Sequence, residues 1–481
     1  MERILSVAAM IEVDASSQRP VDHLMDAAGY GVALSAASMG IGYASVVHVL
    51  AGSGNNGGDG YVAARYLRRR GAAVTVHALS APKAGSPAAR AADAAVQAGV
   101  RVISLGGVHS GDLVIDALFG TGFRGTLPGE VLPWIASGIA VLAVDVPSGV
   151  SGDTGTVEGP AFTAKRTATF HALKTGHVLG EGPDRCGEID VYDIGLEGGT
   201  PAMYRFATRD VVVPHRARTA HKWSAGAVAT IGGVPGLTGA ALLAARSAIV
   251  SGAGVSSILT TAATVSAYES LAPDLVTIQA SESSSWRDHA SEVLALMGRY
   301  DTLVLGPGLE PVSSVFVERI IRQFDGTVVV DAGALNALPR WDVLGERTGP
   351  TVITPHAGEF KRLTGDEPTP EAARWLHDAT GAVVVLKGNP TFVTGEDQLV
   401  VDTGGPELAT IGTGDVLAGM IGAFTASGIP TLNAVAGAAY LHGLAGSRLA
   451  SRQTVTAPDL IREVGVVVAE FVRGATPAVR S

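Results

Sequence analysis

The sequence has little of what marks several common classes of protein. A single cysteine, Cys186, occurs in 481 residues, which excludes intramolecular disulfides and cysteine-cluster metal sites and fits a reducing compartment. Aromatic residues make up only 5% of the chain, too few for a stacking surface along single-stranded nucleic acid. Charged residues make up 17%, the formal net charge is −10 and neither half is basic. We therefore expect no nucleic-acid partner and no membrane partner.

Long apolar runs are also missing. The first residues carry Glu2, Glu12 and Asp14, unlike a secretory signal. The most membrane-like stretch, residues 237–259, contains Arg246 and several small residues, so a buried helix followed by a strand is expected there. We expect a soluble cytoplasmic protein, and the 47% of hydrophobic residues beside so few charges favours a homo-oligomer.

Glycine, in contrast, is abundant at 62 residues, as expected of tight turns and ligand loops. Short β-branched runs alternate with alanine-rich helical stretches, which is typical of βαβ units around a parallel sheet. This alternation fails over residues 198–220. The sequence therefore predicts an α/β protein of two tandem three-layer domains, residues 1–213 and 214–481.

The periodicity also gives approximate elements. In the first domain we expect strands at 46–50, 73–79, 113–117 and 139–146, and helices at 61–70, 87–98 and 131–137. In the second we expect strands at 227–231, 303–305, 328–330, 352–354 and 383–386, a hairpin of 391–393 with 399–401, and helices at 414–426, 432–450 and 458–472.

The segment Gly52–Gly60 reads GSGNNGGDG between an expected strand and an expected helix. Its glycines match the dinucleotide-binding spacing G-x-G-x-x-G. No acid ends the next strand and no Gly-Lys-Ser/Thr follows, so neither a dehydrogenase nor a P-loop is indicated. Asn55, Asn56 and Asp59 either cap the following helix or hold a ligand.

Two further polar loops, residues 116–122 and 145–149, follow strands of the same domain. Ligands of open parallel sheets bind beyond the carboxyl ends of the strands, so these loops are expected to converge. Asn56, Asp116 and Ser148 supply hard oxygen ligands suited to an alkali or alkaline-earth cation. Lys174 adds a cation or a proton-transfer group.

The motifs NNGGDG, DALFGTG and VDVPSG, with the later Lys-x-Gly, resemble the NAD(P)HX epimerase domain over about residues 1–210. The resemblance implies a Rossmann-like fold and conversion of (6R)- to (6S)-NADHX and NADPHX, the hydrated forms of NADH and NADPH. It implies a potassium ion at Asn56, Asp116 and Ser148, with Asp145 and Lys174 as catalytic acid/base candidates. The implied substrate contacts are Asn55, Asn56, Gly57, Gly58, Asp59, Gly120, Thr121, Gly122, Phe123, Arg124, Gly125, Thr126 and Asp145.

In the second half, ATIGTGD ends at Gly414 and Asp415 and opens an expected helix. Glycines at a helix N-terminus suit a bound anion. An aspartate there either pairs with the helix dipole or accepts a proton from a hydroxyl that attacks a phosphoryl group. His356 and Lys387 lie in other loops that follow strands.

HKWSAG, TGAALLAA, LGPGLE, TPHAGEF, KGNPT and GTGD together resemble the ADP/ATP-dependent NAD(P)HX dehydratases, which are ribokinase-like, over about residues 215–475. The resemblance implies phosphorylation of the extra hydroxyl by ADP or ATP with Mg²⁺, and then phosphate elimination, with Asp415 as base. The implied substrate contacts are Ala240, Gly308, His356 and Asp415. The implied nucleotide contacts are Lys387, Gly388, Asn389, Pro390, Thr391 and Gly414.

Five residues depart from the dehydratase pattern: Trp223, Glu310, Gly333, Gly405 and Glu407. The two acids add negative charge beside the expected phosphates and bear on nucleotide choice, metal binding and efficiency.

Both resemblances lead to one substrate, so a bifunctional repair enzyme for hydrated nicotinamide nucleotides is predicted. The alternative is a ribokinase-like kinase of a small hydroxylated metabolite with a non-catalytic nucleotide-binding N-terminal module. The choices of ADP or ATP and of NADHX or NADPHX stay open, as does the oligomeric state.

Overall fold

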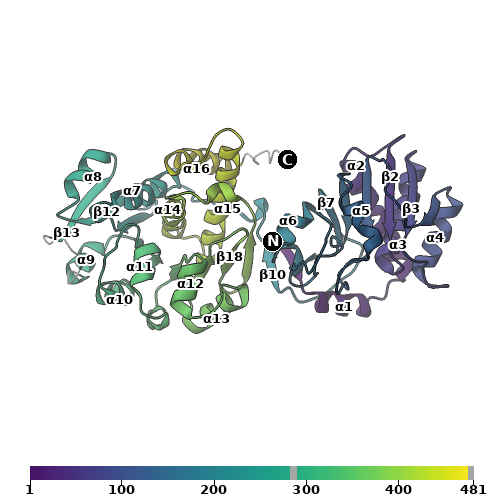
Figure 1. The fold of residues 1–481 in the computed structure, drawn as a ribbon. Helices are drawn as coiled ribbons and strands as arrows, with labels where there is room; N and C mark the ends of the chain where they lie inside the picture. Colours follow the sequence, from purple (N-terminus) through teal and green to yellow (C-terminus); the bar gives the residue numbers. More distant parts are fainter. Residues whose placement is uncertain (282–285, 287–289, 475–481) are drawn as a thin grey trace. The chain divides into compact units, whose positions relative to one another are not determined.

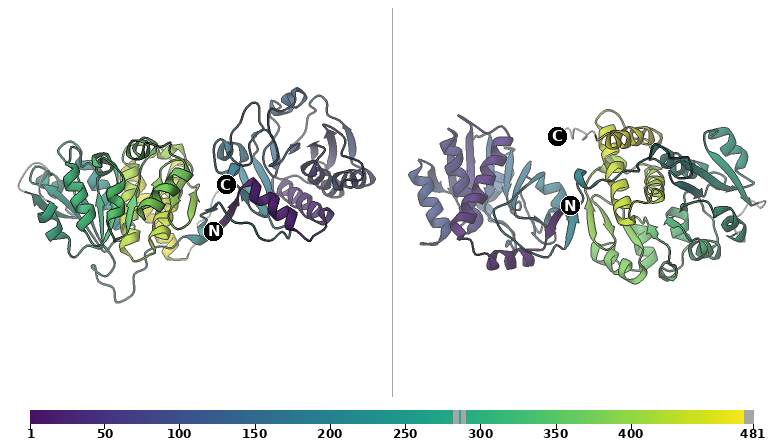
Figure 2. Two further views of the ribbon diagram at one scale, coloured as in Figure 1. Left: turned by 90° about the horizontal axis from the view of Figure 1, so that it is seen from below. Right: turned by 180° about the vertical axis from the view of Figure 1, so that it is seen from behind.

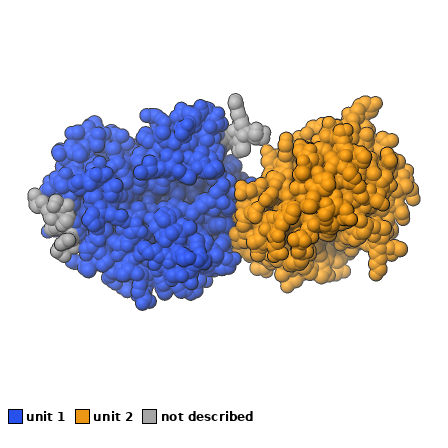
Figure 3. All heavy atoms as spheres, in the orientation of Figure 1, with its two compact units in different colours: residues 1, 204–481 blue, residues 2–203 orange. Residues whose placement is uncertain are grey.

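A computed structural model of the chain describes residues 1–281, 286 and 290–474. They form two compact units, one of residues 2–203 and one of residue 1 with 204–481 (Figure 3). Both units are α/β, as predicted. Over the described ranges, no helix is long and apolar enough to cross a membrane. The stretch 237–259 forms a helix and a strand, α7 (Thr238–Val250) and β12 (Val255–Thr261), as expected.

The unit of residues 2–203 is built on a parallel sheet with the order β4-β3-β2-β5-β6-β7-β9. Its strands are β2 (Val46–Ala51), β3 (Ala73–Ala78), β4 (Arg101–Ser104), β5 (Leu113–Ala117), β6 (Val141–Val144), β7 (Arg166–Phe170) and β9 (Glu188–Tyr192). The central strands are buried on both faces, as their unbroken apolar runs require. The strand order reverses between β2 and β5, which is where open α/β sheets bind ligands.

Helices cover one face of this sheet and shorter segments the other (Figure 1). The first layer is α2 (Val21–Ser38), α3 (Asn55–Arg69) and α4 (Pro87–Gln97), and the second contains η1 (Gly129–Val131) and α5 (Leu132–Ile135). The remaining elements are β1 (Glu2–Leu5), α1 (Val7–Ser16), β8 (Leu173–Lys174), η2 (Thr175–His177) and α6 (Gly182–Cys186).

Two predicted helices in this unit had wrong bounds. The helix expected at 61–70 begins at Asn55, so most of the glycine-rich segment is helical instead of forming a loop. Its glycines serve close packing: a Cβ atom at Gly57 would lie 1.9 Å from the carbonyl oxygen of Gly52. The helix expected at 131–137 is reduced to one turn, with Pro133 near its start.

The unit of residue 1 and residues 204–481 contains the strand order β13-β12-β11-β14-β15-β16-β17-β18-β19. These strands are parallel as far as β17, and β18 and β19 form the predicted antiparallel hairpin. They are β11 (Ala227–Ile231), β12, β13 (Val276–Ser281), β14 (Thr302–Leu305), β15 (Thr327–Val330), β16 (Thr351–Ile353), β17 (Val383–Leu386), β18 (Thr391–Thr394) and β19 (Gln398–Val401); β10 (Met203–Arg205) pairs with β19 through Tyr204 and Arg205.

Two helical layers enclose this sheet (Figures 1 and 2). One contains α7, α14 (Thr413–Ala426), α15 (Thr431–Ala450) and α16 (Ala457–Val472). The other contains α9 (Ala290–Met297), α10 (Ser314–Gln323), α11 (Ala332–Ala337), α12 (Ala357–Thr364) and α13 (Pro370–Thr380). The short elements are α8 (Val265–Leu271), η3 (Thr208–Asp210), η4 (Asp342–Glu346) and η5 (Pro406–Leu408).

Candidate functional sites

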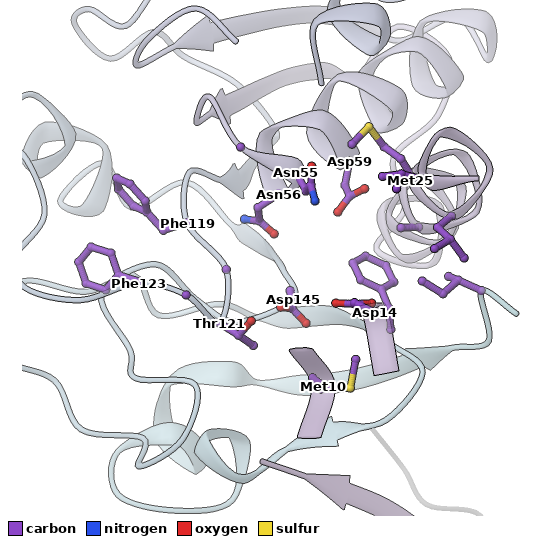
Figure 4. A pocket seen from close by; sticks show the side chains of 18 of the residues that line it. Met10, Asp14, Met25, Asn55, Asn56, Asp59, Phe119, Thr121, Phe123 and Asp145 are labelled. Carbon is purple, nitrogen blue, oxygen red and sulfur yellow. The ribbon is translucent and has the colours of Figure 1, made fainter. Parts of the chain in front are cut away.

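A cavity of about 460 Å³ opens at the switch point of the first sheet, beyond β2, β5 and β6 (Figure 4). Its size suits a small-molecule ligand. The predicted site residues that line it are Asn55, Asn56, Asp59, Gly120, Thr121, Gly122, Phe123, Asp145 and Lys174. The loops expected to converge from the sequence therefore do meet in one place.

Several predicted contacts of the same segments lie elsewhere. Gly57 and Gly58 are buried in α3, where they permit close packing, and are not among the residues that line the cavity. Arg124, Gly125 and Thr126 are exposed beyond it, and the Arg124 guanidinium donates to the carbonyl oxygen of Phe123 at 2.9 Å.

Asp145 is held in a backbone conformation that non-glycine residues rarely adopt, with φ of +67°. Its Oδ1 atom lies 2.7 Å from Lys174 Nζ and accepts a hydrogen bond from Thr169 Oγ1 at 2.9 Å. Burial would raise the pKa of the Asp145 carboxyl, but the charge and hydrogen bond of Lys174 outweigh it and leave the pKa below its usual value. Asp145 is therefore a carboxylate that faces the cavity.

Lys174 is almost completely buried, and its side chain is 2% exposed. Besides the ion pair with Asp145, its ammonium donates to Thr169 Oγ1 at 2.8 Å and to the carbonyl oxygen of Phe170 at 3.0 Å. Three partners use all three of its protons. The geometry fits a fixed positive charge beside Asp145 better than a proton donor.

Asp116 and Ser148, two of the three predicted cation ligands, lie behind the cavity and bond to each other. The Ser148 hydroxyl donates to Asp116 Oδ1 at 2.7 Å and its backbone N–H donates to Oδ2 at 2.7 Å. Burial raises the pKa of Asp116 to about 6 despite these bonds. The third residue, Asn56, has a buried amide nitrogen with no hydrogen-bond partner among the described residues.

Sequence reasoning missed the contribution of α1 and α2 to this cavity. Met10 and Asp14 line it from α1, and Leu24 and Met25 from α2. No helix was predicted over α1, although Met10 and Val13 have the spacing of one buried helical face, and nothing local shows that this helix lies against the loops of the sheet.

In the other unit, an ion-pair cluster lies at the ends of β15, β16 and β17. Lys387 Nζ lies 3.0 Å from Oδ1 of Asp331 and 3.9 Å from Oε2 of Glu359. Thr354 Oγ1 donates to Asp331 Oδ1 at 2.7 Å. Burial would lower the pKa of Lys387, but the charges of Asp331 and Glu359 raise it, so the lysine is a stable cation.

Asp415 lies in the first turn of α14, whose N-cap Gly412 has a left-handed conformation with φ of +88°. Burial, together with the nearby charge of Asp331, raises the pKa of Asp415 to about 7, against the opposing effect of Lys387. A Cβ atom at Gly414 would lie 3.8 Å from Lys387 Nζ. The structure thus brings together the anion loop, its aspartate and the lysine predicted for the nucleotide.

His356 is the N-cap of α12. Its Nδ1 atom accepts from the backbone N–H groups of Gly358 and Glu359 at 3.0 and 3.2 Å, and Glu359 Oε2 accepts from the His356 N–H at 2.9 Å. The imidazole remains exposed. Local capping explains its orientation, and its Nε2 atom lies 3.5 Å from Oε1 of the same Glu359.

Gly308 and Ala240 are neighbours, since a Cβ atom at Gly308 would lie 3.3 Å from the Ala240 Cβ atom. Of the predicted nucleotide segment, Gly388 and Asn389 are exposed, Pro390 is buried, and Thr391 Oγ1 donates to the carbonyl oxygen of Gly388 at 3.0 Å.

The unusual residues of this half have partners of their own. Glu310 Oε1 accepts from Asn336 Nδ2 at 2.6 Å, and a Cβ atom at Gly333 would lie 2.9 Å from the Glu310 Cγ atom. Glu407 Oε1 accepts from Ser447 Oγ at 3.0 Å, and Trp223 packs under the Arg299 guanidinium. The glutamate at 310 therefore occupies space that the glycine at 333 leaves free.

Comparison with known families matches both halves. Residues 21–176 match the family described as YjeF-related protein N-terminus, and residues 228–465 match the family described as NAD(P)H-hydrate dehydratase. The bifunctional NAD(P)H-hydrate repair enzyme Nnr of Moorella thermoacetica is 36% identical over 456 residues, covering 86% of this chain and 85% of that protein. Its counterpart in Salinibacter ruber is 36% identical over 474 residues, covering 88% and 87%.

Among solved structures, the ADP/ATP-dependent NAD(P)H-hydrate dehydratase of Bacillus subtilis, co-crystallised with ATP and Mg²⁺, is similar to this chain. The two are 28% identical with a TM-score of 0.50, and the match covers 56% of this chain and 99% of that one.

Proposed function

Because this chain belongs to the bifunctional NAD(P)H-hydrate repair enzymes, we propose residue roles for the epimerase and dehydratase reactions of that family. The observation that carries the assignment is the 36% sequence identity with two repair enzymes of this family. The matches cover most of this chain and most of each relative, and so include both halves of the chain. It favours repair of NADHX and NADPHX over phosphorylation of an unrelated small metabolite.

In the dehydratase half, Asp415 is the base that takes the proton from the substrate hydroxyl as that oxygen attacks the terminal phosphoryl group of ADP or ATP. A carboxyl with a pKa of about 7 is half ionised near neutral pH and still basic enough to accept a proton. Phosphate then leaves in place of hydroxide, a much poorer leaving group.

The substrate binds beside Ala240, Gly308 and His356, and the nucleotide beside Lys387–Thr391 and Gly414. The start of α14 and the Lys387 ammonium lie close together, since a Cβ atom at Gly414 would lie 3.8 Å from Lys387 Nζ, and both a helix N-terminus and an ammonium stabilise a phosphate. Over the described ranges, no cluster of three acidic, histidine or cysteine side chains could hold a metal by itself. When bound with the phosphates of ADP or ATP, Mg²⁺ would neutralise part of their negative charge.

In the epimerase half, Asn55, Asn56, Asp59 and the loop Gly120–Phe123 contact the hydrated nucleotide, and Asp145 is a proton acceptor. The strained conformation of Asp145 supports a functional role, since such strain gathers at active sites. Lys174 keeps Asp145 ionised and oriented through their 2.7 Å contact.

Potassium is proposed at Asn56, Asp116 and Ser148. The donor set fits, because a buried carboxylate, a hydroxyl and an amide are hard oxygen ligands. When bound, the ion would supply positive charge close to the substrate phosphates.

The test uses the purified full chain and a mixture of both NADHX epimers with Mg²⁺, K⁺ and either ADP or ATP. Recovery of reduced-nicotinamide absorbance from the whole mixture is expected. If one fraction recovers quickly and the rest only at the spontaneous epimerisation rate, the epimerase claim is wrong. No recovery with either nucleotide by folded protein contradicts the dehydratase claim.

The proposal keeps residues 1–213 as the epimerase domain and 214–481 as the dehydratase domain, in a cytoplasmic homo-oligomer. Both matched family segments, 21–176 and 228–465, lie within these limits. Light scattering of the purified chain would test the oligomeric state.

A further inference from the structure

The epimerase cavity contains more acid than its one buried cation can balance. Asp14, Asp59 and Asp145 all line it, and Lys174 is the lysine that lines it with them. Figure 4 shows the three carboxyl groups turned toward the same space. Three carboxylates beside one ammonium would leave two uncompensated charges, which is costly, and the proposed potassium ion does not offset them because its own ligand Asp116 balances its charge. At least one of the three is therefore expected to keep its proton.

Asp59 is the carboxyl with the least support for a negative charge. It is 9% exposed, and among the described residues no hydrogen bond or ion pair involves its side chain. It is buried because α2 packs tightly against α3 at this point. A Cβ atom at Gly29 would lie 2.7 Å from the carbonyl oxygen of Asp59 and 2.4 Å from the Val62 Cβ atom. Asp145, by contrast, has Lys174 and Thr169 as partners.

We propose that Asp59 is the catalytic proton donor of the epimerase, working opposite the Asp145 carboxylate, and that Asp14 is a positioning residue whose charge keeps the proton on Asp59. The proposal rests on the epimerase function proposed above and adds an acid to its site. Two like groups whose environments differ this strongly are the usual arrangement of an acid and a base in one active site.

The electrostatics of the surrounding elements agree. Burial raises the pKa of Asp59 well above its usual value, and the charges of Asp145 and Asp14 raise it further. Burial and the charge of Asp145 also raise the pKa of Asp14, but less than that of Asp59, because the charges of Lys174 and His171 oppose the rise.

Other charges near this helix are already engaged. On α2, Asp26 is paired with Arg65 and with the Tyr66 hydroxyl. His177 Nε2 forms a hydrogen bond with the Asp145 carbonyl oxygen at 2.8 Å. Among these groups, those that act on Asp59 are negative, so they favour its neutral form.

This pairing supplies a balanced reaction. The substrate carries a hydroxyl on the ring carbon next to the ring nitrogen. Asp59 gives its proton to that hydroxyl, the carbon–oxygen bond breaks, and the nitrogen lone pair forms a carbon–nitrogen double bond as water leaves. A water molecule then adds to the carbon from the other face, and Asp145 takes its proton. Exchange with solvent returns the proton to Asp59.

The test is epimerisation of purified (6R)-NADHX by the full chain without ADP or ATP, so that the dehydratase cannot act, with the epimers separated by chromatography. Asp59→Asn keeps the size and hydrogen-bonding capacity of the side chain but has no acidic proton. We expect kcat to fall by roughly 10²-fold or more while KM changes little. The matched control is Asp22→Asn on α2, an exposed residue paired with Arg90, which should leave both constants unchanged.

A raised KM with unchanged kcat in Asp59→Asn would overturn the proposal, because it would show a binding role alone. Asp14→Asn gives an independent test if the first variant does not fold. Loss of a nearby negative charge lowers the pKa of Asp59, so the alkaline limb of the kcat profile should move to lower pH. An unmoved limb would also overturn the proposal. If the unsubstituted chain does not epimerise the substrate at all, the proposed function itself fails, which is a different result.

Discussion

The dehydratase half should lose activity when the pH falls slightly below neutral. Asp415 must be ionised to act as a base, and burial beside Asp331 raises its pKa to about 7. An ordinary aspartate would be ionised well below pH 6 and would give no such dependence. The pH profile of kcat/KM therefore tests both the role of Asp415 and the cause of its shifted pKa.

The size of the effect follows from that pKa. At pH 6, one unit below it, about one-tenth of the molecules have Asp415 ionised, so kcat/KM should be about a tenth of its plateau value. Asp331→Asn removes a negative charge near Asp415 and also removes the ion-pair partner of Lys387. Both changes favour the ionised form of Asp415, because the lysine charge is then less neutralised. The acidic limb should then move down by roughly one unit.

The assay follows recovery of reduced-nicotinamide absorbance from (6S)-NADHX with saturating nucleotide and Mg²⁺ between pH 5.5 and 8.5. Asp402→Asn is a matched control, since this carboxylate pairs with Arg205 at 2.7 Å in the same unit, and its profile should equal that of the unsubstituted chain. A flat profile over this range would refute the argument. So would Asp331→Asn with an unmoved limb.

Three further predictions follow from close contacts. Lys174→Met leaves the Asp145 carboxylate without its buried partner and should lower the free energy of unfolding by about 3 kcal/mol at pH 7. The loss should be smaller at pH 4, because without Lys174 burial raises the pKa of Asp145 and the variant takes up a proton there. Equal losses at both pH values in urea unfolding would contradict this. Gly308→Ala places a Cβ atom 2.3 Å from the Leu237 carbonyl oxygen at a φ of +63°, so the rate of dehydration should fall at least tenfold while epimerisation is retained. Gly298→Ala is the control, because a Cβ atom there meets open space. A Gly308→Ala variant with full dehydratase activity would contradict the reasoning. Gly333→Ala should lower the melting temperature, because its Cβ atom would lie 2.9 Å from the Glu310 Cγ atom. Adding Glu310→Gly should remove this clash and restore part of the loss. Additive melting shifts for the two substitutions would contradict the prediction, because they would show that the two positions are independent.

Most elements of the fold were predictable because their signals are local. The strands Ala227–Ile231 and Val383–Leu386 occur as predicted, and the hairpin of β18 and β19 was placed from its apolar runs and turn residues. The start of α3 was predicted six residues too late, because the six glycine and polar residues from Asn55 to Gly60 have low helix propensity. Tertiary packing against the loop after β2 outweighs that preference.

The candidate sites divide in the same way. The motif residues Asp145 and Asp415 were predicted from the sequence, since one follows a strand and the other opens a helix, each beside glycines. The shifts of their pKa values were not predicted, because the charges that act on them come from distant parts of the sequence. Lys174 acts on Asp145, and Asp331 and Lys387 act on Asp415. Asp14 was noted only as an acid near the start of the chain, yet it lines the epimerase cavity.

The sequence alone thus determined the family and the order of its two parts, and it predicted the loops proposed to carry the chemistry, because motifs and hydrophobic periodicity are short-range properties of the chain. Only the tertiary structure decided in which direction the pKa of each carboxyl is shifted. That depends on burial and on Coulomb interactions between residues that are far apart in sequence, such as Asp14, Asp59 and Asp145, and these interactions exist only once the chain has folded.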